Sequence, residues 1–99
     1  MVLEHAVITV RPGTNRQFEA AMGEARRIIG AAHGFRSLAL HRGVDTETEY
    51  VLLVEWDTLE DHMEGFRQSE AFTRWRALIG PFFEGQPAVT HLTAVEWST

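Results

Sequence analysis

The chemistry that this sequence could support begins with its histidines, of which there are five. Imidazole, with a pKa of about 6.5, is the natural base near neutral pH. His62 falls between Leu59 and Phe66 in a region of helical spacing. It is the candidate catalytic base if its side chain points under the helix toward the sheet. A histidine on a helix is more often a partly exposed surface residue, so that alternative stays open.

A metal site has little support from the spacing of these residues. No histidines are spaced H-x-H, H-x-x-x-H or H-E-x-x-H, and the chain has no cysteine. His5, His41 and His91 each fall in a predicted strand, and a cluster of these with Glu55 across strands stays open. For Glu55 itself, a structural ion pair at a subunit seam is the favoured interpretation. There is no P-loop or GxGxxG motif, and neither a metal nor a cofactor is expected.

Aromatic and basic residues suited to a planar ligand gather in the second half of the chain. Large aromatics at strand and helix spacing are usually core residues, but an apolar pocket is lined by the same types. Arg67 and Arg76 could each bind a ligand phenolate or carboxylate, although a surface ion pair with Glu60, Glu64 or Glu70 is the favoured alternative. Trp56 joins His62 as a candidate catalytic residue, and the candidate substrate-binding residues are Phe66, Phe72, Trp75 and Arg76.

Composition limits the classes of function. The 99 residues, 44% hydrophobic and 23% charged, predict one globular domain over residues 1–99. The net charge is −5 and the basic residues are scattered, which argues against nucleic-acid binding. The first residues lack a basic region, and no apolar stretch approaches the roughly 20 residues of a membrane span. A cytoplasmic protein is expected by default.

The first half of the chain predicts a strand, a helix and a strand. Residues 2–10 alternate between two faces, and a Pro-Gly pair then ends the strand. Thr14 and Gln17 form a capping box, after which apolar residues recur at helical spacing as far as Ala32. Gly34 is expected to close this helix in the left-handed conformation. Residues 35–42 predict the second strand.

The second half predicts a strand, a helical region and a final strand. Residues 50–57 are apolar on both faces, which is typical of a strand buried on both sides. Thr58 and Asp61 open a helical region, Ser69 is a second N-cap, and Gly80-Pro81 ends the helix. Residues 88–97 predict the last strand. The βαββαβ order predicts an α+β domain with both helices on one face of a four-stranded antiparallel sheet.

The other face of this sheet carries Val7, Val51 and Leu53, and no predicted element remains to cover it. Two identical apolar faces can bury each other, so a homodimer is expected.

Three segments resemble the antibiotic biosynthesis monooxygenase family. They are residues 6–13 with the following Phe18, residues 51–62, and residues 65–83. The resemblance implies a ferredoxin-like monomer that pairs through its sheet into a dimeric α+β barrel. Some members oxidise aromatic polyketide phenols to quinones with dioxygen and without metal or flavin, whereas others degrade heme.

The heme-degrading branch can be tested by position. The resemblance to those enzymes places Phe66 where they carry an assisting tryptophan and Arg76 where they carry the iron-ligating histidine. Arginine stays protonated and offers no lone pair, so heme degradation is disfavoured.

Two functions are therefore expected from the sequence. The first is a cofactor-independent monooxygenase that oxidises a phenolic or quinol-like aromatic molecule with dioxygen. The second is a non-enzymatic dimeric barrel that binds a small apolar ligand without transforming it.

Overall fold

The computed structural model describes residues 1–98 as four strands, two α-helices, one π-helix and one 3₁₀ turn. The observed order agrees with the predicted βαββαβ pattern. Along the chain the elements are β1 (Val2–Thr9), α1 (Asn15–Ile29), β2 (Phe35–Arg42), β3 (Glu49–Trp56), η1 (Asp61–Phe66), α2 (Glu70–Ile79), η2 (Gly80–Phe82) and β4 (Ala88–Leu92).

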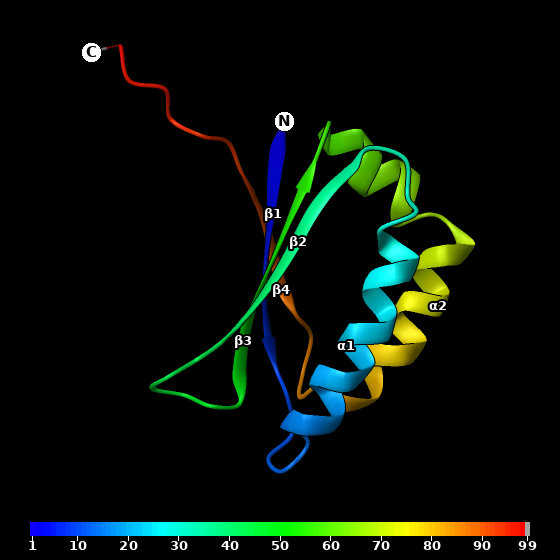
Figure 1. The fold of residues 1–99 in the computed structure, drawn as a ribbon, viewed down its shortest axis with the longest axis vertical. Helices are drawn as coiled ribbons and strands as arrows, with labels where there is room; N and C mark the ends of the chain where they lie inside the picture. Colours follow the sequence, from blue (N-terminus) through cyan, green and yellow to red (C-terminus); the bar gives the residue numbers. More distant parts are fainter. Residues whose placement is uncertain (99) are drawn as a thin grey trace.

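The four strands form one antiparallel sheet in the order β2-β3-β1-β4. Both α-helices lie on one face of this sheet, and the other face is open (Figure 1). The predicted α+β architecture is thereby confirmed. Because β1 and β3 are the central strands, their inward side chains form the floor on which the helices pack.

The core lies between the sheet and the helices. Alternate residues of β1 and β3 point inward, as the period of two in the sequence predicted. The largest completely buried side chains include Trp56, Tyr50 and Phe18. The buried part of α1 is the predicted apolar stripe, with Phe18, Met22, Ala25 and Ile29. Phe18 packs against Tyr50 with a ring-centroid distance of 4.8 Å.

Helix α1 differs from its prediction at both ends. Thr14 is the N-cap, but its side chain caps no helical N–H, because its hydroxyl instead donates to the Arg11 carbonyl at 2.7 Å. The capping box is therefore wrong in detail. The helix ends at Ile29, three residues before Ala32, where the predicted apolar stripe ends, and single turns follow. Gly34 does have the predicted positive φ, +82°, but in the turn before β2.

The second helical region divides into two helices. The Thr58 hydroxyl accepts the backbone N–H of Asp61 at 3.1 Å, as the capping pattern predicted, and η1 follows. The Ser69 hydroxyl accepts the N–H of Phe72 at 3.3 Å, which confirms Ser69 as the N-cap of α2. The Ser69 cap therefore begins α2 as a helix separate from η1.

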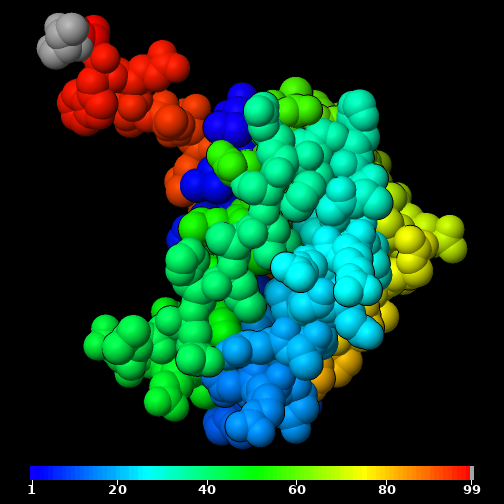
Figure 2. Space-filling view, in the orientation of Figure 1, coloured from blue at the N-terminus to red at the C-terminus, as the bar shows by residue number. Residues whose placement is uncertain are grey.

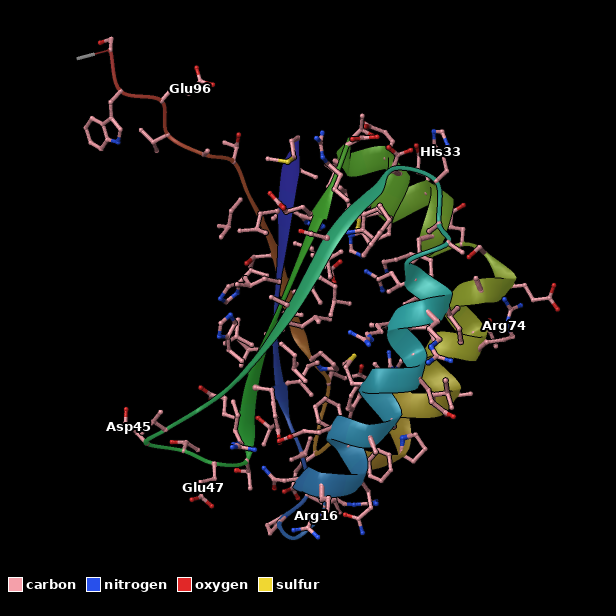
Figure 3. The ribbon with its side chains drawn as sticks, in the orientation of Figure 1. Arg16, His33, Asp45, Glu47, Arg74 and Glu96 are labelled. Carbon is pink, nitrogen blue, oxygen red and sulfur yellow. The ribbon has the colours of Figure 1, made fainter. Side chains whose placement is uncertain are left out.

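The last strand is shorter than predicted. β4 ends at Leu92 rather than at residue 97, and residues 93–98 extend away from the sheet (Figures 1 and 2). In this tail the side chain of Trp97 is 88% exposed. The charged side chains labelled in Figure 3, among them Asp45, Arg74 and Glu96, point outward. No helix within residues 1–98 is long and apolar enough to cross a membrane.

Candidate functional site

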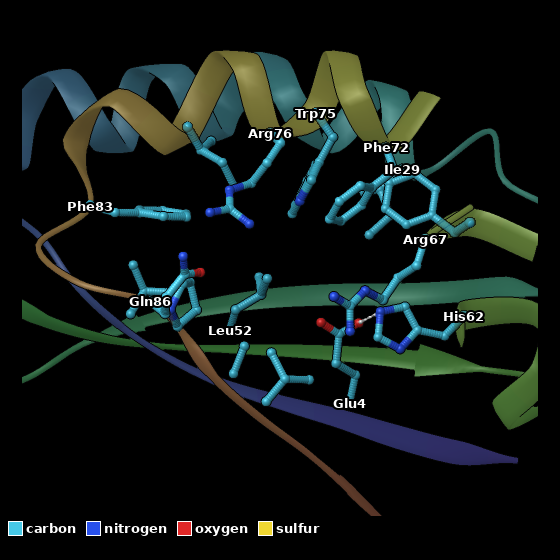
Figure 4. Close-up of a pocket in the computed structure, with 16 residues that line it drawn as sticks. Glu4, Ile29, Leu52, His62, Arg67, Phe72, Trp75, Arg76, Phe83 and Gln86 are labelled. Atoms are coloured by element: carbon cyan, nitrogen blue, oxygen red, sulfur yellow. Dashed lines mark ion pairs between the residues drawn. The ribbon is translucent and has the colours of Figure 1, made fainter. Parts of the chain in front are cut away.

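A cavity of about 310 Å³ lies between the sheet and the second helical region (Figure 4). Its floor is apolar and is made by Ala6 and Ile8 of β1 and Leu52 of β3. Its aromatic wall comes from η1, α2 and the segment after α2. The aromatic lining residues are Phe66, Phe72, Trp75 and Phe83. The size is at the small end of the range for small-molecule sites, about 300–1,000 Å³.

A carboxylate closes one end of this cavity. Glu4 points inward from β1, at the same face as Ala6 and Ile8, and is only 6% exposed. Its Oε1 accepts the indole N–H of Trp56 at 3.0 Å and lies 3.2 Å from Nε2 of His62. No hydrogen bond to Oε2 is formed within residues 1–98. Every fully buried side-chain nitrogen or oxygen atom there has a hydrogen-bond partner, so Oε2 is not fully buried but accessible. Oε2 is therefore free to meet a ligand.

His62 is held beside Glu4 by the π-helix. The N–H of Arg67 donates to the His62 carbonyl, five residues back, at 2.9 Å, and this wide turn directs both His62 and Phe66 inward. The imidazole stacks on Trp56 with a centroid distance of 5.2 Å and an interplanar angle of 19°. It is 3% exposed, so the sequence alternative of an exposed surface histidine is wrong.

A second histidine completes a chain of hydrogen bonds. Nδ1 of His62 lies 2.8 Å from Nε2 of His91, which comes from β4 directly opposite Glu4 in the strand register. Each contact needs one proton between its two atoms, and which atom carries it depends on the tautomers. With Glu4 ionised, Nε2–H of His62 donates to Glu4, and Nε2–H of His91 donates to His62. The chain runs from the cavity to the half-buried His91.

Burial shifts the pKa values of these groups toward neutral forms. Burial, together with the positive fields of His91 and Arg67, lowers the pKa of His62 from 6.5 to about 4. Burial also lowers the pKa of His91 and raises that of Glu4, although the Trp56 hydrogen bond and Arg67 oppose the shift of Glu4. His62 is therefore neutral at pH 7. The raised pKa makes Glu4 a stronger proton acceptor than an ordinary carboxylate.

Two arginines also line the cavity rather than forming surface ion pairs. The guanidinium of Arg67 lies 5.7 Å from the centroid of Phe72, and that of Arg76 lies 5.1 Å from the centroid of Phe83. Neither takes part in a salt bridge within the described part of the chain. The alternative of ion pairs with neighbouring glutamates is therefore wrong, because the aromatic rings draw both side chains toward the cavity.

The structure brings together most of the candidate residues from the sequence. His62, Phe66, Phe72, Trp75 and Arg76 all line the cavity. Trp56, the other candidate catalytic residue, does not line the cavity: it is completely buried against His62 and Phe66. Its contact with the site is the hydrogen bond to Glu4.

Glu55 lies away from the cavity, on the open face of the sheet. Its carboxylate accepts the hydroxyl of Ser37 at 2.6 Å and forms no ion pair within residues 1–98. Its neighbour across the strands within residues 1–98 is a serine, and the ion pair expected at a subunit seam stays a prediction.

Glu4 and His91 were missed by the sequence reasoning. A signal for Glu4 existed, because a charge two residues before Ala6 falls on the inward face of the strand. No such signal existed for His91, whose place depends on the pairing of β1 with β4.

Metal and heme ligation find little support in these side chains. No group of three or more His, Asp or Glu residues suited to a metal occurs in residues 1–98. Both ring nitrogens of His62 are engaged, by Glu4 and His91. Iron ligation by His62 would break one of these contacts, and Arg76 offers no lone pair.

The sequence profile that matches this chain is that of the antibiotic biosynthesis monooxygenases, over residues 1–78. The chain belongs to the antibiotic biosynthesis monooxygenase family. The matched residues include Glu4 and His62, whereas His91 lies beyond them. A family relative, the uncharacterized protein YczJ of Bacillus subtilis (strain 168), is 39% identical over 95 residues, which is 96% of this chain and 100% of YczJ.

Solved structures agree with this family assignment. A Bordetella bronchiseptica protein assigned to the antibiotic biosynthesis monooxygenases is 40% identical, with a TM-score of 0.93, covering 96% of this chain and 97% of its own. SnoaB of Streptomyces nogalater, a cofactor-independent oxygenase, has a TM-score of 0.82 at 18% identity and covers 98% of this chain and 95% of its own. At that identity the likeness to SnoaB shows the shared fold alone.

Proposed function

We propose that this protein is a cofactor-independent monooxygenase that oxidises a phenolic or quinol-like aromatic molecule with dioxygen. The observation that carries the proposal is the free carboxylate oxygen of Glu4 at one end of a cavity walled by aromatic rings. Flat apolar walls suit a planar aromatic ligand, and the single buried carboxylate offers a proton acceptor for its hydroxyl group. The description of SnoaB as a cofactor-independent oxygenase supports the same class of reaction.

The first step is loss of the substrate's phenolic proton. Glu4 Oε2 accepts this proton, because burial raises the pKa of the Glu4 carboxyl group. His62 donates its Nε2–H to Oε1 of Glu4 and accepts the Nε2–H of His91, so these two hydrogen bonds hold the carboxylate in place while Oε2 takes the proton. Trp56 fixes the carboxylate by donating to Oε1. In this proposal His62 and Trp56 are both positioning residues.

The second step is electron transfer from the deprotonated substrate to dioxygen. A phenolate is electron-rich, and its oxidation needs a site that excludes water more than it needs added catalytic groups. For an anthrone-type substrate, the ring CH₂ group becomes a carbonyl. One oxygen atom of dioxygen enters that carbonyl, and the other leaves as water with the two hydrogens.

The proposed functional unit is a homodimer that pairs through the open face of the sheet. Val7, Val51 and Leu53 are half-buried on that face, and no element within residues 1–98 covers them. Leu92, 46% exposed, lies on the same face at the edge strand β4. A second copy of the sheet would bury these side chains.

Oxygen uptake tests the proposed activity. Purified, chelator-treated protein is incubated with a panel of anthrone-type and quinol substrates, and dioxygen consumption is followed with an electrode. We expect uptake above the buffer rate for at least one substrate, and a much lower rate for the E4Q variant. Uptake equal to buffer across the whole panel would refute the proposal.

The second candidate is a barrel that binds a small apolar ligand without transforming it. It is favoured by the apolar floor and the aromatic wall of the cavity, which suit an apolar ligand without any chemical step. Native mass spectrometry separates the two candidates. A retained metabolite that stays chemically unchanged in the presence of dioxygen supports binding alone.

A further inference from the structure

The end of the cavity opposite Glu4 is built around Arg76. This residue lies in the last turn of α2, and its guanidinium points into the cavity beside the ring of Phe83 (Figure 4). The side chain of Gln86 projects toward the same space from the segment before β4. Trp75 lies between this end and the end occupied by Arg67, His62 and Glu4.

The two arginines of the cavity differ in their electrostatic surroundings. Arg67 lies close enough to Glu4 to lower the pKa of that carboxyl group, so the charges of the two residues partly compensate each other. Arg76 has no carboxylate partner within residues 1–98, and its side chain is half-buried. A half-buried guanidinium that contacts only a ring keeps most of its donors free for a ligand.

We propose that the aromatic substrate carries an acidic group, a carboxylate in the simplest case, which Arg76 binds at the edge of the ring system opposite the reacting hydroxyl. The inference deepens the proposed function and depends on it for the direction of the substrate, with the hydroxyl at Glu4. Trp75 then faces the ring system between the two polar ends. Arg76 is thus a specificity-determining residue for hydroxy-aromatic acids.

The cavity volume agrees with a ligand of this kind. About 310 Å³ holds a fused ring system of two or three rings, and the two polar ends leave room for one substituent each. A guanidinium binds a carboxylate through two parallel N–H···O bonds, which also fixes the plane of the ligand. Gln86 can add a donor from its amide at the same edge.

Binding of matched naphthalene probes tests this inference without turnover. The probes are 6-hydroxy-2-naphthoate, which has the hydroxyl and carboxylate on opposite edges, and 2-naphthol, which lacks the carboxylate. Their dissociation constants are measured anaerobically by isothermal titration calorimetry on the wild-type protein, on R76Q and on R74Q. Arg74 is the matched control, because it lies on the same helix and points to solvent (Figure 3).

We expect the wild-type protein and R74Q to bind the hydroxynaphthoate about 10- to 100-fold more tightly than 2-naphthol, since hydrogen bonds to charged groups have that strength. R76Q should bind both probes with similar affinity while binding 2-naphthol as well as the wild type does, which shows an intact fold. Equal affinity of the wild type for both probes, or an unchanged preference in R76Q, would overturn the inference. Loss of oxygen uptake alone would overturn only the proposed activity.

Discussion

The buried imidazole of His62 predicts a measurable pH dependence of stability. His62 is 3% exposed and lies against Glu4 and His91, and its pKa falls from 6.5 to about 4 on folding. The unfolded chain therefore binds this proton more readily than the folded protein does. Stability from the neutral histidine is complete above about pH 6.5, declines as the pH falls, and is fully lost near pH 4.

The magnitude follows from the size of the shift. One pKa unit corresponds to about 1.4 kcal/mol, so the full contribution of His62 is about 3 kcal/mol. Between pH 7 and pH 4.5 the loss is about 2 kcal/mol. Glu4 acts in the opposite sense, because its raised pKa destabilises the folded protein as the pH rises. The variant H62Q retains Glu4 and His91, so their contributions largely cancel in a comparison with the wild type.

Urea denaturation at pH 7 and pH 4.5, at one protein concentration, measures this difference. The free energy of unfolding of the wild type should fall by about 2 kcal/mol more than that of H62Q. H33Q is the control, because it removes a histidine whose side chain is 96% exposed. Equal pH dependence in the wild type and H62Q would refute the electrostatic account of His62.

Three further predictions concern the turn before β2, the buried carboxylate and the open sheet. G34A should destabilise the protein more than G13A. Both glycines have a positive φ, so each alanine costs about 1–3 kcal/mol of backbone strain. Only the alanine at position 34 would also place its Cβ against the Asp61 side chain, and urea denaturation compares the two variants. E4Q should gain more thermal stability than the wild type between pH 4.5 and pH 8, because the wild-type carboxyl, whose pKa is raised, ionises at a cost in the folded state. Equal gains in the two proteins would contradict this. In sedimentation, the wild type should have twice the chain mass of 11.2 kDa and L53E the single mass; a wild-type monomer would exclude the dimer.

The layout of the fold was predictable because side-chain periodicity reports which face of an element is buried. Alternation in β1 and β3 and the stripe of α1 predicted the inward residues correctly. Element ends were less predictable, since they depend on single hydrogen bonds. Thr14 bonds to the preceding turn instead of capping α1, and the pairing of β4 with β1 ends at Leu92, opposite Leu3.

The site was predictable only where the second helical region carries it. His62, Phe66 and Arg76 follow from the spacing of the second helical region. The π-turn that directs His62 inward has no sequence signature, and His91 meets His62 only because β4 pairs with β1. Contacts between distant elements of this kind depend on register, which the local pattern does not specify.

The central claim is that Glu4 starts the oxidation of an aromatic substrate by dioxygen without a metal or cofactor. The most direct test is oxygen-18 incorporation by chelator-treated protein, measured by mass spectrometry for the wild type and E4Q on the substrate with the fastest oxygen uptake. We predict one labelled oxygen atom per product molecule, formed at least about 100-fold more slowly by E4Q. Product without the label, or the same rate in both proteins, would contradict the account.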